Sequence, residues 1–204
     1  MDAVRRAYGD MAGAYTDRFG TTAQVDPDDL ARITRRLAIR PGVVADAGCG
    51  PGHLTAHLQL QGVDAIGIDL VPELLGHARA AHPHGSYVRG SMERLPVPDG
   101  SLAGVLAWYS LIHLPPDALD GVLAELRRAV RSGATLVVGF FDGGEHAAFE
   151  HKVATAYFWP VDELGRRLEQ VGFTEVERWQ RPAVPSGPRA HAAIVATADE
   201  PTPP

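Results

Sequence analysis

An apolar run leads into three closely spaced glycines in Val43-Val44-Ala45-Asp46-Ala47-Gly48-Cys49-Gly50-Pro51-Gly52. The apolar part predicts a buried strand, and the glycines predict a tight turn, because glycine accepts backbone conformations that other residues avoid. A helix is expected to follow over about 52–61. This layout places backbone N–H groups and a helix N-terminus at the carboxyl edge of a parallel sheet, where nucleotide-like ligands bind.

Two carboxylates accompany the turn. Asp46 stands two positions before the first glycine, and Asp69 ends a second apolar strand, Ala65-Ile66-Gly67-Ile68-Asp69. A dinucleotide fingerprint has the form G-x-G-x-x-G/A, whereas here the glycines stand at 48, 50 and 52 and His53 takes the sixth position. An acid so near the turn is unfavourable for a bound phosphate and favourable for a ligand that carries a cation.

The pattern D-x-G-x-G-x-G, with a second acid at the end of the next strand, resembles the class I S-adenosylmethionine-dependent methyltransferases. The resemblance implies S-adenosyl-L-methionine as cofactor and S-adenosyl-L-homocysteine as product. Asp46 is then placed near the cationic amino-acid end of the cofactor, directly or through water. Asp69 is placed to accept hydrogen bonds from both ribose hydroxyls.

Other segments extend the resemblance over residues 43–140. The segment 90–101 is similar to the third family motif, but Ser91 stands where the family usually has an aspartate that touches adenine. The segment 104–114 is similar to the fourth motif, and 8–15 to the N-terminal Y-x-x-x-A-x-x-Y, whose tyrosines close over the cofactor. The resemblance therefore implies a cofactor site made of Tyr8, Tyr15, Asp46, Gly48, Cys49, Gly50, Asp69, Leu70, Ser91, Met92, Ala107 and Tyr109.

Strands and helices alternate along the rest of the chain, which predicts an α/β fold with helices on both faces of a sheet. Strands are expected at about 43–47, 65–69, 86–90, 103–109, 134–141, 173–180 and 190–197. Helices are expected at about 52–61, 72–82, 117–131 and 161–171, with two or three more before residue 40. The resemblance implies a Rossmann-like seven-stranded sheet of order 3-2-1-4-5-7-6 with the last strand antiparallel.

One domain is expected over residues 1–198, with a helical N-terminal cap at 1–40 and a disordered tail at 199–204. The 204 residues are 45% hydrophobic, enough for a sizeable core, and the net charge of −6 disfavours nucleic acid as a partner. No apolar run is long enough for a membrane span, a single cysteine excludes an internal disulfide, and no histidine cluster indicates a metal site. We expect a cytoplasmic protein, monomeric or homodimeric.

The acceptor of the methyl group is expected beyond the cofactor, among the N-terminal helix, the loop after the fourth strand and the segment 141–160. That segment mixes acids, histidines and aromatic residues, and it is either a lid with a substrate wall or a solvated connection. His113, Glu145 and His146 are the candidates for a general base or for acceptor positioning, and Cys49 is expected to pack rather than react.

The interpretation favoured by these residues is a methyltransferase that acts on an O or N atom of a small molecule. Two alternatives remain open from the sequence. One is a non-catalytic module that binds S-adenosylmethionine, which a methyl-transfer assay would distinguish. The other is a nicotinamide-dependent oxidoreductase, which the glycine spacing and Asp46 disfavour.

Overall fold

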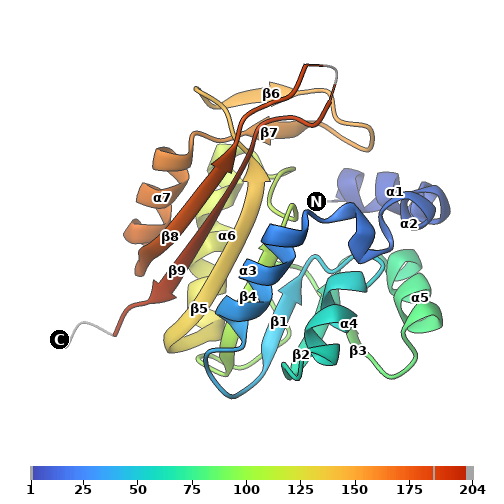
Figure 1. Cartoon of the computed structure of the whole chain (residues 1–204), viewed down its shortest axis with the longest axis horizontal. Helices are drawn as coiled ribbons and strands as arrows, with labels where there is room; N and C mark the ends of the chain where they lie inside the picture. Colours follow the sequence, from blue (N-terminus) through green and yellow to red (C-terminus); the bar gives the residue numbers. More distant parts are fainter. Residues whose placement is uncertain (1, 186, 201–204) are drawn as a thin grey trace.

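Seven strands form one mixed sheet in the order β3-β2-β1-β4-β5-β9-β8 (Figure 1). The computed structural model of the chain describes residues 2–185 and 187–200. The strands of this sheet are β1 (Val44–Ala47), β2 (Ala65–Asp69), β3 (Ser86–Arg89), β4 (Leu102–Trp108), β5 (Val130–Phe141), β8 (Phe173–Arg181) and β9 (His191–Ala198). With the strands of this sheet renumbered along the chain the order is 3-2-1-4-5-7-6, and β9 alone runs opposite to the other strands. The predicted topology is confirmed.

The parallel register brings the ends of the central strands to one edge. Asp46 of β1 is opposite Gly67 of β2 and Leu106 of β4. Because the sequence carries its polar residues just after these strands, the strand ends gather them around a common opening.

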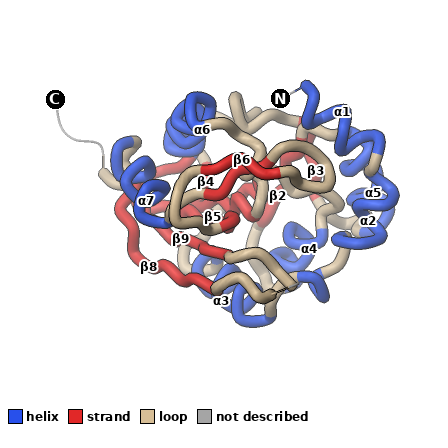
Figure 2. The backbone as a smooth tube through the Cα atoms, turned by 90° about the horizontal axis from the view of Figure 1, so that it is seen from above, coloured by secondary structure: helices blue, strands red, loops and turns tan. Residues whose placement is uncertain are grey.

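Helices cover both faces of the sheet, as Figure 2 shows from above. Apolar side chains of α3 (Pro27–Leu37) and α4 (His53–Leu60) pack on one face, and those of α6 (Pro116–Ala129) and α7 (Val161–Gln170) pack on the other. The apolar residues of α6 recur at helical spacing in the sequence, and this stripe is buried at Leu119, Val122, Leu123 and Leu126. Helix α5 (Pro72–Ala81) packs against β2 and β3.

The N-terminal region forms two short helices, α1 (Asp2–Asp10) and α2 (Ala12–Phe19), which break at Met11. A 3-10 turn, η1 (Thr22–Gln24), connects them to α3. Helices α1 and α2 pack against α5, whereas α3 packs against β4 and β5. Asp26 caps α3 by accepting a hydrogen bond from the backbone N–H of Asp28 at 2.9 Å, as its D-P-D-D sequence predicts.

The segment 141–160 contains an antiparallel hairpin of β6 (Ala147–Phe149) and β7 (Ala156–Phe158), which no pattern in the sequence predicts. It lies above the carboxyl edge of β4 and β5 in Figure 1. At the other end of the chain, Asp199 accepts hydrogen bonds from Arg127 and Thr174. Residues 201–204 of the expected tail lie outside the described residues.

Within residues 2–185 and 187–200, none of the helices has the length and apolarity needed to cross a bilayer. The same residues contain no group of three or more histidine, cysteine, aspartate or glutamate side chains arranged to hold a metal ion.

Candidate functional site

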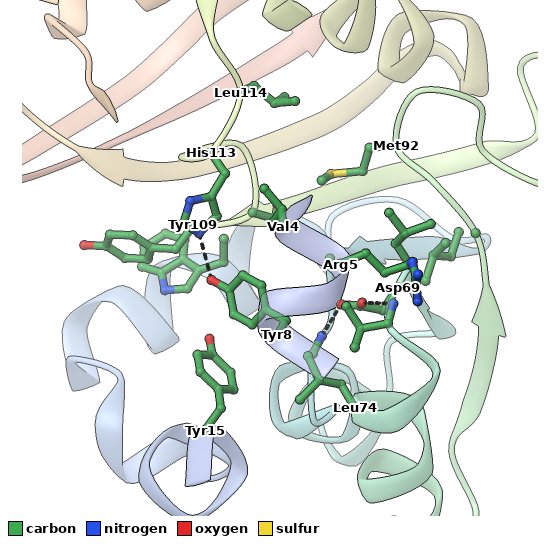
Figure 3. A pocket seen from close by; sticks show the side chains of 18 residues that line it. Val4, Arg5, Tyr8, Tyr15, Asp69, Leu74, Met92, Tyr109, His113 and Leu114 are labelled. Carbon is green, nitrogen blue, oxygen red and sulfur yellow. Dashed lines mark hydrogen bonds between the residues drawn. The ribbon is translucent and has the colours of Figure 1, made fainter. Parts of the chain in front are cut away.

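A cavity of about 750 Å³, counting its open mouth, lies at the carboxyl edge of β1, β2 and β4 (Figure 3). Helix α1 and the start of α2 cover one side of it. Of the residues expected at the site, those that line the cavity are Tyr8, Tyr15, Gly48, Gly50, Asp69, Leu70, Met92, Tyr109 and His113.

Six other expected site residues do not line this cavity: Asp46, Cys49, Ser91, Ala107, Glu145 and His146. Cys49 packs among Leu75, Ala78 and Tyr87, and the Ser91 hydroxyl accepts a hydrogen bond from the backbone N–H of Glu93 at 3.1 Å. Ala107 is buried within β4.

Glu145 and His146 lie beside the hairpin rather than in the cavity. Glu145 lines a separate, open depression. The His146 ring stacks on Tyr157, with ring centroids 5.2 Å apart, and meets Trp159 edge-on. The geometry therefore brings only His113 of the three acid–base candidates to the cavity.

The glycine turn forms the floor of the cavity. Gly48 has a φ of +80°, and a Cβ built there would lie 2.4 Å from Cβ of Ser110. A side chain at residue 48 would both strain the backbone and collide with the segment after β4. Gly50 also has a positive φ, of +53°, and it faces Tyr15. The cradle thus has room for close approach of a ligand to the backbone.

Asp69 connects this turn to the segment after β2. Its carboxylate accepts hydrogen bonds from the backbone N–H groups of Gly50 and Val71, each at 2.8 Å. Burial raises the pKa of Asp69, and these N–H groups oppose the shift. Each carboxylate oxygen has a further lone pair, so Asp69 can still accept hydrogen bonds from a ligand.

Asp46 is fully buried beneath the turn. The Thr55 hydroxyl donates a hydrogen bond to its carboxylate at 2.6 Å. Burial raises the pKa of Asp46 to about 7, although the Thr55 hydrogen bond opposes the shift. Asp46 is therefore poised to gain or lose a proton near neutral pH.

The buried carboxyl of Asp46 predicts a pH-dependent stability. Its pKa is higher in the folded chain than in the unfolded chain, so its contribution is fully present below about pH 4 and is lost as the pH rises through about 7. Asp46→Asn removes this loss and retains an acceptor for Thr55. As the pH rises from about 4 to 8, the free energy of unfolding of the wild type should therefore fall by roughly 2–4 kcal/mol relative to that of Asp46→Asn.

Urea denaturation of both proteins across this range measures the difference. Asp64→Asn, at an exposed position before β2, is the matched control and should follow the wild type. Equal pH dependence of the wild type and Asp46→Asn would show that Asp46 stays ionised in the folded chain.

Tyr8 and His113 meet in the wall of the cavity. Their side chains are joined by a hydrogen bond of 2.9 Å between the Tyr8 hydroxyl and Nε2 of His113 (Figure 3). Nδ1 of His113 lies 2.8 Å from the carbonyl oxygen of Thr155, in the hairpin connection. Because a carbonyl can only accept, Nδ1 carries the proton and Nε2 accepts from Tyr8.

Burial lowers the pKa of His113, although the hydrogen bond to Thr155 opposes the shift. Burial also raises the pKa of Tyr8. Tyr8 is therefore a neutral phenol and His113 a neutral imidazole at pH 7. His113, in the loop after β4, therefore links Tyr8 of the N-terminal cap to the backbone of Thr155 in the hairpin.

Several cavity residues were not predicted from the sequence, among them Arg5, Trp108 and Ser110. Tyr109, which was predicted, has a backbone that no sequence pattern indicated. Its φ of +54° is the only positive value at a non-glycine residue in the described part of the chain. Such a conformation costs on the order of 1–3 kcal/mol and is retained only where the surroundings enforce it.

Known proteins resemble this chain in sequence and in fold. The family profile described as "Methyltransferase domain" matches residues 44–133. The malonyl-[acyl-carrier protein] O-methyltransferase of Pectobacterium atrosepticum is 32% identical over 135 residues, which are 66% of this chain and 51% of that protein. The demethylmenaquinone methyltransferase of Beutenbergia cavernae is 33% identical over 150 residues, which are 69% of this chain and 62% of that protein. The chain thus matches between half and two thirds of these relatives' length.

A solved structure extends the likeness to nearly the whole chain. The 1,6-didemethyltoxoflavin-N1-methyltransferase of Burkholderia thailandensis, solved with 1,6-didemethyltoxoflavin and S-adenosylhomocysteine, superimposes with a TM-score of 0.75 at 24% identity. The superposition covers 98% of this chain and 88% of that one. Together with the strand order and the glycine turn, these matches show that the chain belongs to the class I S-adenosylmethionine-dependent methyltransferase family.

Proposed function

We propose that the protein binds S-adenosylmethionine in the cavity above β1, β2 and β4 and transfers its methyl group to an O or N atom of a small molecule. The observation that carries the proposal is the pair formed by the Gly48–Gly50 cradle and the Asp69 carboxylate at the tip of β2. The chemistry of the donor set fits this cofactor. The Asp69 carboxylate can accept hydrogen bonds from a ribose diol, and the glycines of the turn allow a ligand to approach the backbone closely.

Bound S-adenosylmethionine would supply a methyl group already activated by its sulfonium. The residues proposed to hold it are Gly48, Gly50, Asp69, Leu70, Met92 and the two tyrosines of the cap, Tyr8 and Tyr15. Asp46, Cys49, Ser91 and Ala107 support the cavity from behind or beside it. The protein's remaining task is to align the acceptor, exclude water and take up a proton where the acceptor has one to lose.

His113 is the proposed base. Its Nε2 is unprotonated, lies at the cavity and is reached through the Tyr8 hydroxyl. A proton leaving the acceptor would end on Nε2, either directly once Tyr8 turns away or by passing through the Tyr8 oxygen. Protonated His113 would keep its Nδ1–H on Thr155. Glu145 and His146 are weaker candidates because neither lines the cavity.

The acceptor is proposed to be a small molecule. The relatives described above are named for malonyl-[acyl-carrier protein], demethylmenaquinone and 1,6-didemethyltoxoflavin, so the family alone does not choose among acceptors. The net charge of −6 supports an acceptor other than nucleic acid. A cytoplasmic location and a monomeric or homodimeric state stay predictions.

Calorimetry and a transfer assay test the proposal. S-adenosylmethionine and S-adenosylhomocysteine should bind, whereas NADH should not bind comparably. Cofactor labelled in its methyl group should then pass the label to one class in panels of carboxylic acids, phenols, thiols and amines. Preferential binding of NADH would reject the methyltransferase, and binding without transfer to any panel would favour the non-catalytic alternative.

A further inference from the structure

Tyr109, His191 and Asp29 form a buried chain of polar side chains that begins at the wall of the cavity. Tyr109 follows β4, His191 begins β9, and Asp29 lies in the first turn of α3. We propose that this chain is a positioning device, which holds the segment 108–110 in the conformation that the cavity needs in order to bind S-adenosylmethionine. Only the identity of the ligand, S-adenosylmethionine, is taken from the proposed function.

A hydrogen bond joins the cavity wall to β9, and a longer polar contact joins β9 to α3. The Tyr109 hydroxyl lies 2.5 Å from Nδ1 of His191, and Nε2 of His191 lies 3.6 Å from Oδ2 of Asp29. His191 and Asp29 are only 3% and 2% exposed. The Asp29 carboxylate also accepts hydrogen bonds from Trp179 and from both terminal nitrogens of Arg181. A fully buried carboxylate with this many donors is a fixed anchor.

The protonation states of Tyr109, His191 and Asp29 decide which of these side chains donates a proton to which. Burial lowers the pKa of His191 to about 4, although Asp29 opposes the shift. Burial and the charge of Asp29 raise the pKa of Tyr109. Burial would raise the pKa of Asp29, but hydrogen bonds from Arg181 and Trp179 outweigh it and hold that pKa below its usual value. Tyr109 therefore donates to Nδ1, and the Nε2–H of His191 faces an ionised carboxylate.

The backbone of Tyr109 explains why an anchor is needed there. A left-handed φ of +54° is unfavourable for an aromatic residue. Its neighbours Trp108 and Ser110 line the cavity, and Ser110 sits directly against Gly48 of the glycine turn. If Tyr109 relaxed to a common conformation, Ser110 would shift against the turn. The anchor on the Tyr109 side chain therefore acts on the shape of the cofactor cradle.

Tyr109 acts here through its neighbours rather than on the reacting atoms. In Figure 3 its ring points away from Tyr8 and Asp69. The ring packs against Phe141, with centroids 4.9 Å apart, and its hydroxyl is directed to His191. His191 and Asp29 do not line the cavity at all. The three side chains are positioning residues.

The test compares the affinity for S-adenosylhomocysteine, by calorimetry, among variants of the full chain. Tyr109→Phe and His191→Leu each break the hydrogen bond and should raise Kd about tenfold. His191→Asn offers an amide oxygen near the place of Nδ1, so its Kd should stay within about threefold of the wild type. Val122→Ala, in the buried face of α6, is the control for a plain loss of stability and should leave Kd unchanged.

Two measurements without ligand keep the test independent of the proposed function. The ring nitrogens of His191 should show protonation at Nε2 and not at Nδ1 by NMR. Amide hydrogen exchange at residues 109 and 110 should speed up about tenfold in Tyr109→Phe and stay unchanged in Val122→Ala.

Unchanged affinity and exchange in Tyr109→Phe would overturn the inference, as would a proton on Nδ1 of His191. Failure of the wild type to bind S-adenosylhomocysteine would instead contradict the proposed function. The exchange rates would then still decide whether the chain holds residues 108–110.

Discussion

Replacing Asp69 with alanine is expected to weaken binding of S-adenosylmethionine by about 30- to 1000-fold. Each hydrogen bond to a charged acceptor contributes about 1.5–3 kcal/mol, and water in the vacated space offsets part of the loss. Loss of two ribose contacts then amounts to about 2–4 kcal/mol, which corresponds to that range of affinity. Calorimetry with S-adenosylmethionine measures it directly.

The structure adds a second effect of this substitution, because Asp69 also holds the N–H groups of Gly50 and Val71. Binding of a 2′-deoxy analogue of the cofactor separates the two effects. If Asp69 contacts the ribose, the wild type should lose affinity for the analogue, and Asp69→Ala should lose little more. Glu73→Ala removes an exposed acid from the neighbouring helix and should bind like the wild type. A loss under threefold in Asp69→Ala, with the fold intact, would place the ribose elsewhere.

Replacing His113 with alanine is expected to lower turnover by about a hundredfold or more, while cofactor affinity stays within about threefold. His113 lines the cavity next to Tyr8, whereas Asp69 lies on the other side of Tyr8 in Figure 3. The wild-type rate should rise with pH as His113 loses its proton. Because burial lowers the pKa of His113, the midpoint of the rise should lie below its ordinary value of 6.5.

His151→Ala is the matched control, since the His151 ring lies 5.4 Å from that of His113 but has no hydrogen bond to Tyr8. Tyr8→Phe distinguishes the two routes for the proton. Turnover should fall in this variant if the proton passes through the Tyr8 oxygen, and it should persist if the proton passes directly to Nε2 of His113. Unchanged turnover in His113→Ala would mean that the acceptor arrives deprotonated or needs no base. A collapse of cofactor affinity in the same variant would place His113 against the cofactor instead of the acceptor.

The framework of the fold was predictable because its signals are local. The apolar runs before Asp46 and Asp69 and the stripe of α6 each follow from residue periodicity, and the structure has them within a few residues of the expected positions. The strand order came from the resemblance instead, since periodicity says nothing of which strands pair. The hairpin of β6 and β7 was missed because three-residue strands in a polar segment show no alternation that stands out.

The side-chain partnerships within the site could not be predicted. Tyr8 and His113 are 105 positions apart, and Tyr109 and His191 are 82 apart, so only the folded chain brings them together. The left-handed backbone of Tyr109 also has no signal in the sequence, because the residue is neither glycine nor asparagine. The placement of Asp46 beneath the turn, rather than in the cavity, likewise depends on the orientation of one strand residue.

The reversal of β9 has a consequence for how such a protein can diversify. In the parallel strands only the residues at the carboxyl end reach the cavity edge, but β9 brings its first residue there, with His191 opposite Phe141 of β5. Two connections therefore end at the same edge, 142–159 and 182–190, and residues of both line one open depression. Neither connection contributes to the glycine turn or to Asp69. Insertions and exchanges in these two loops can therefore reshape this depression without altering the glycine turn or Asp69.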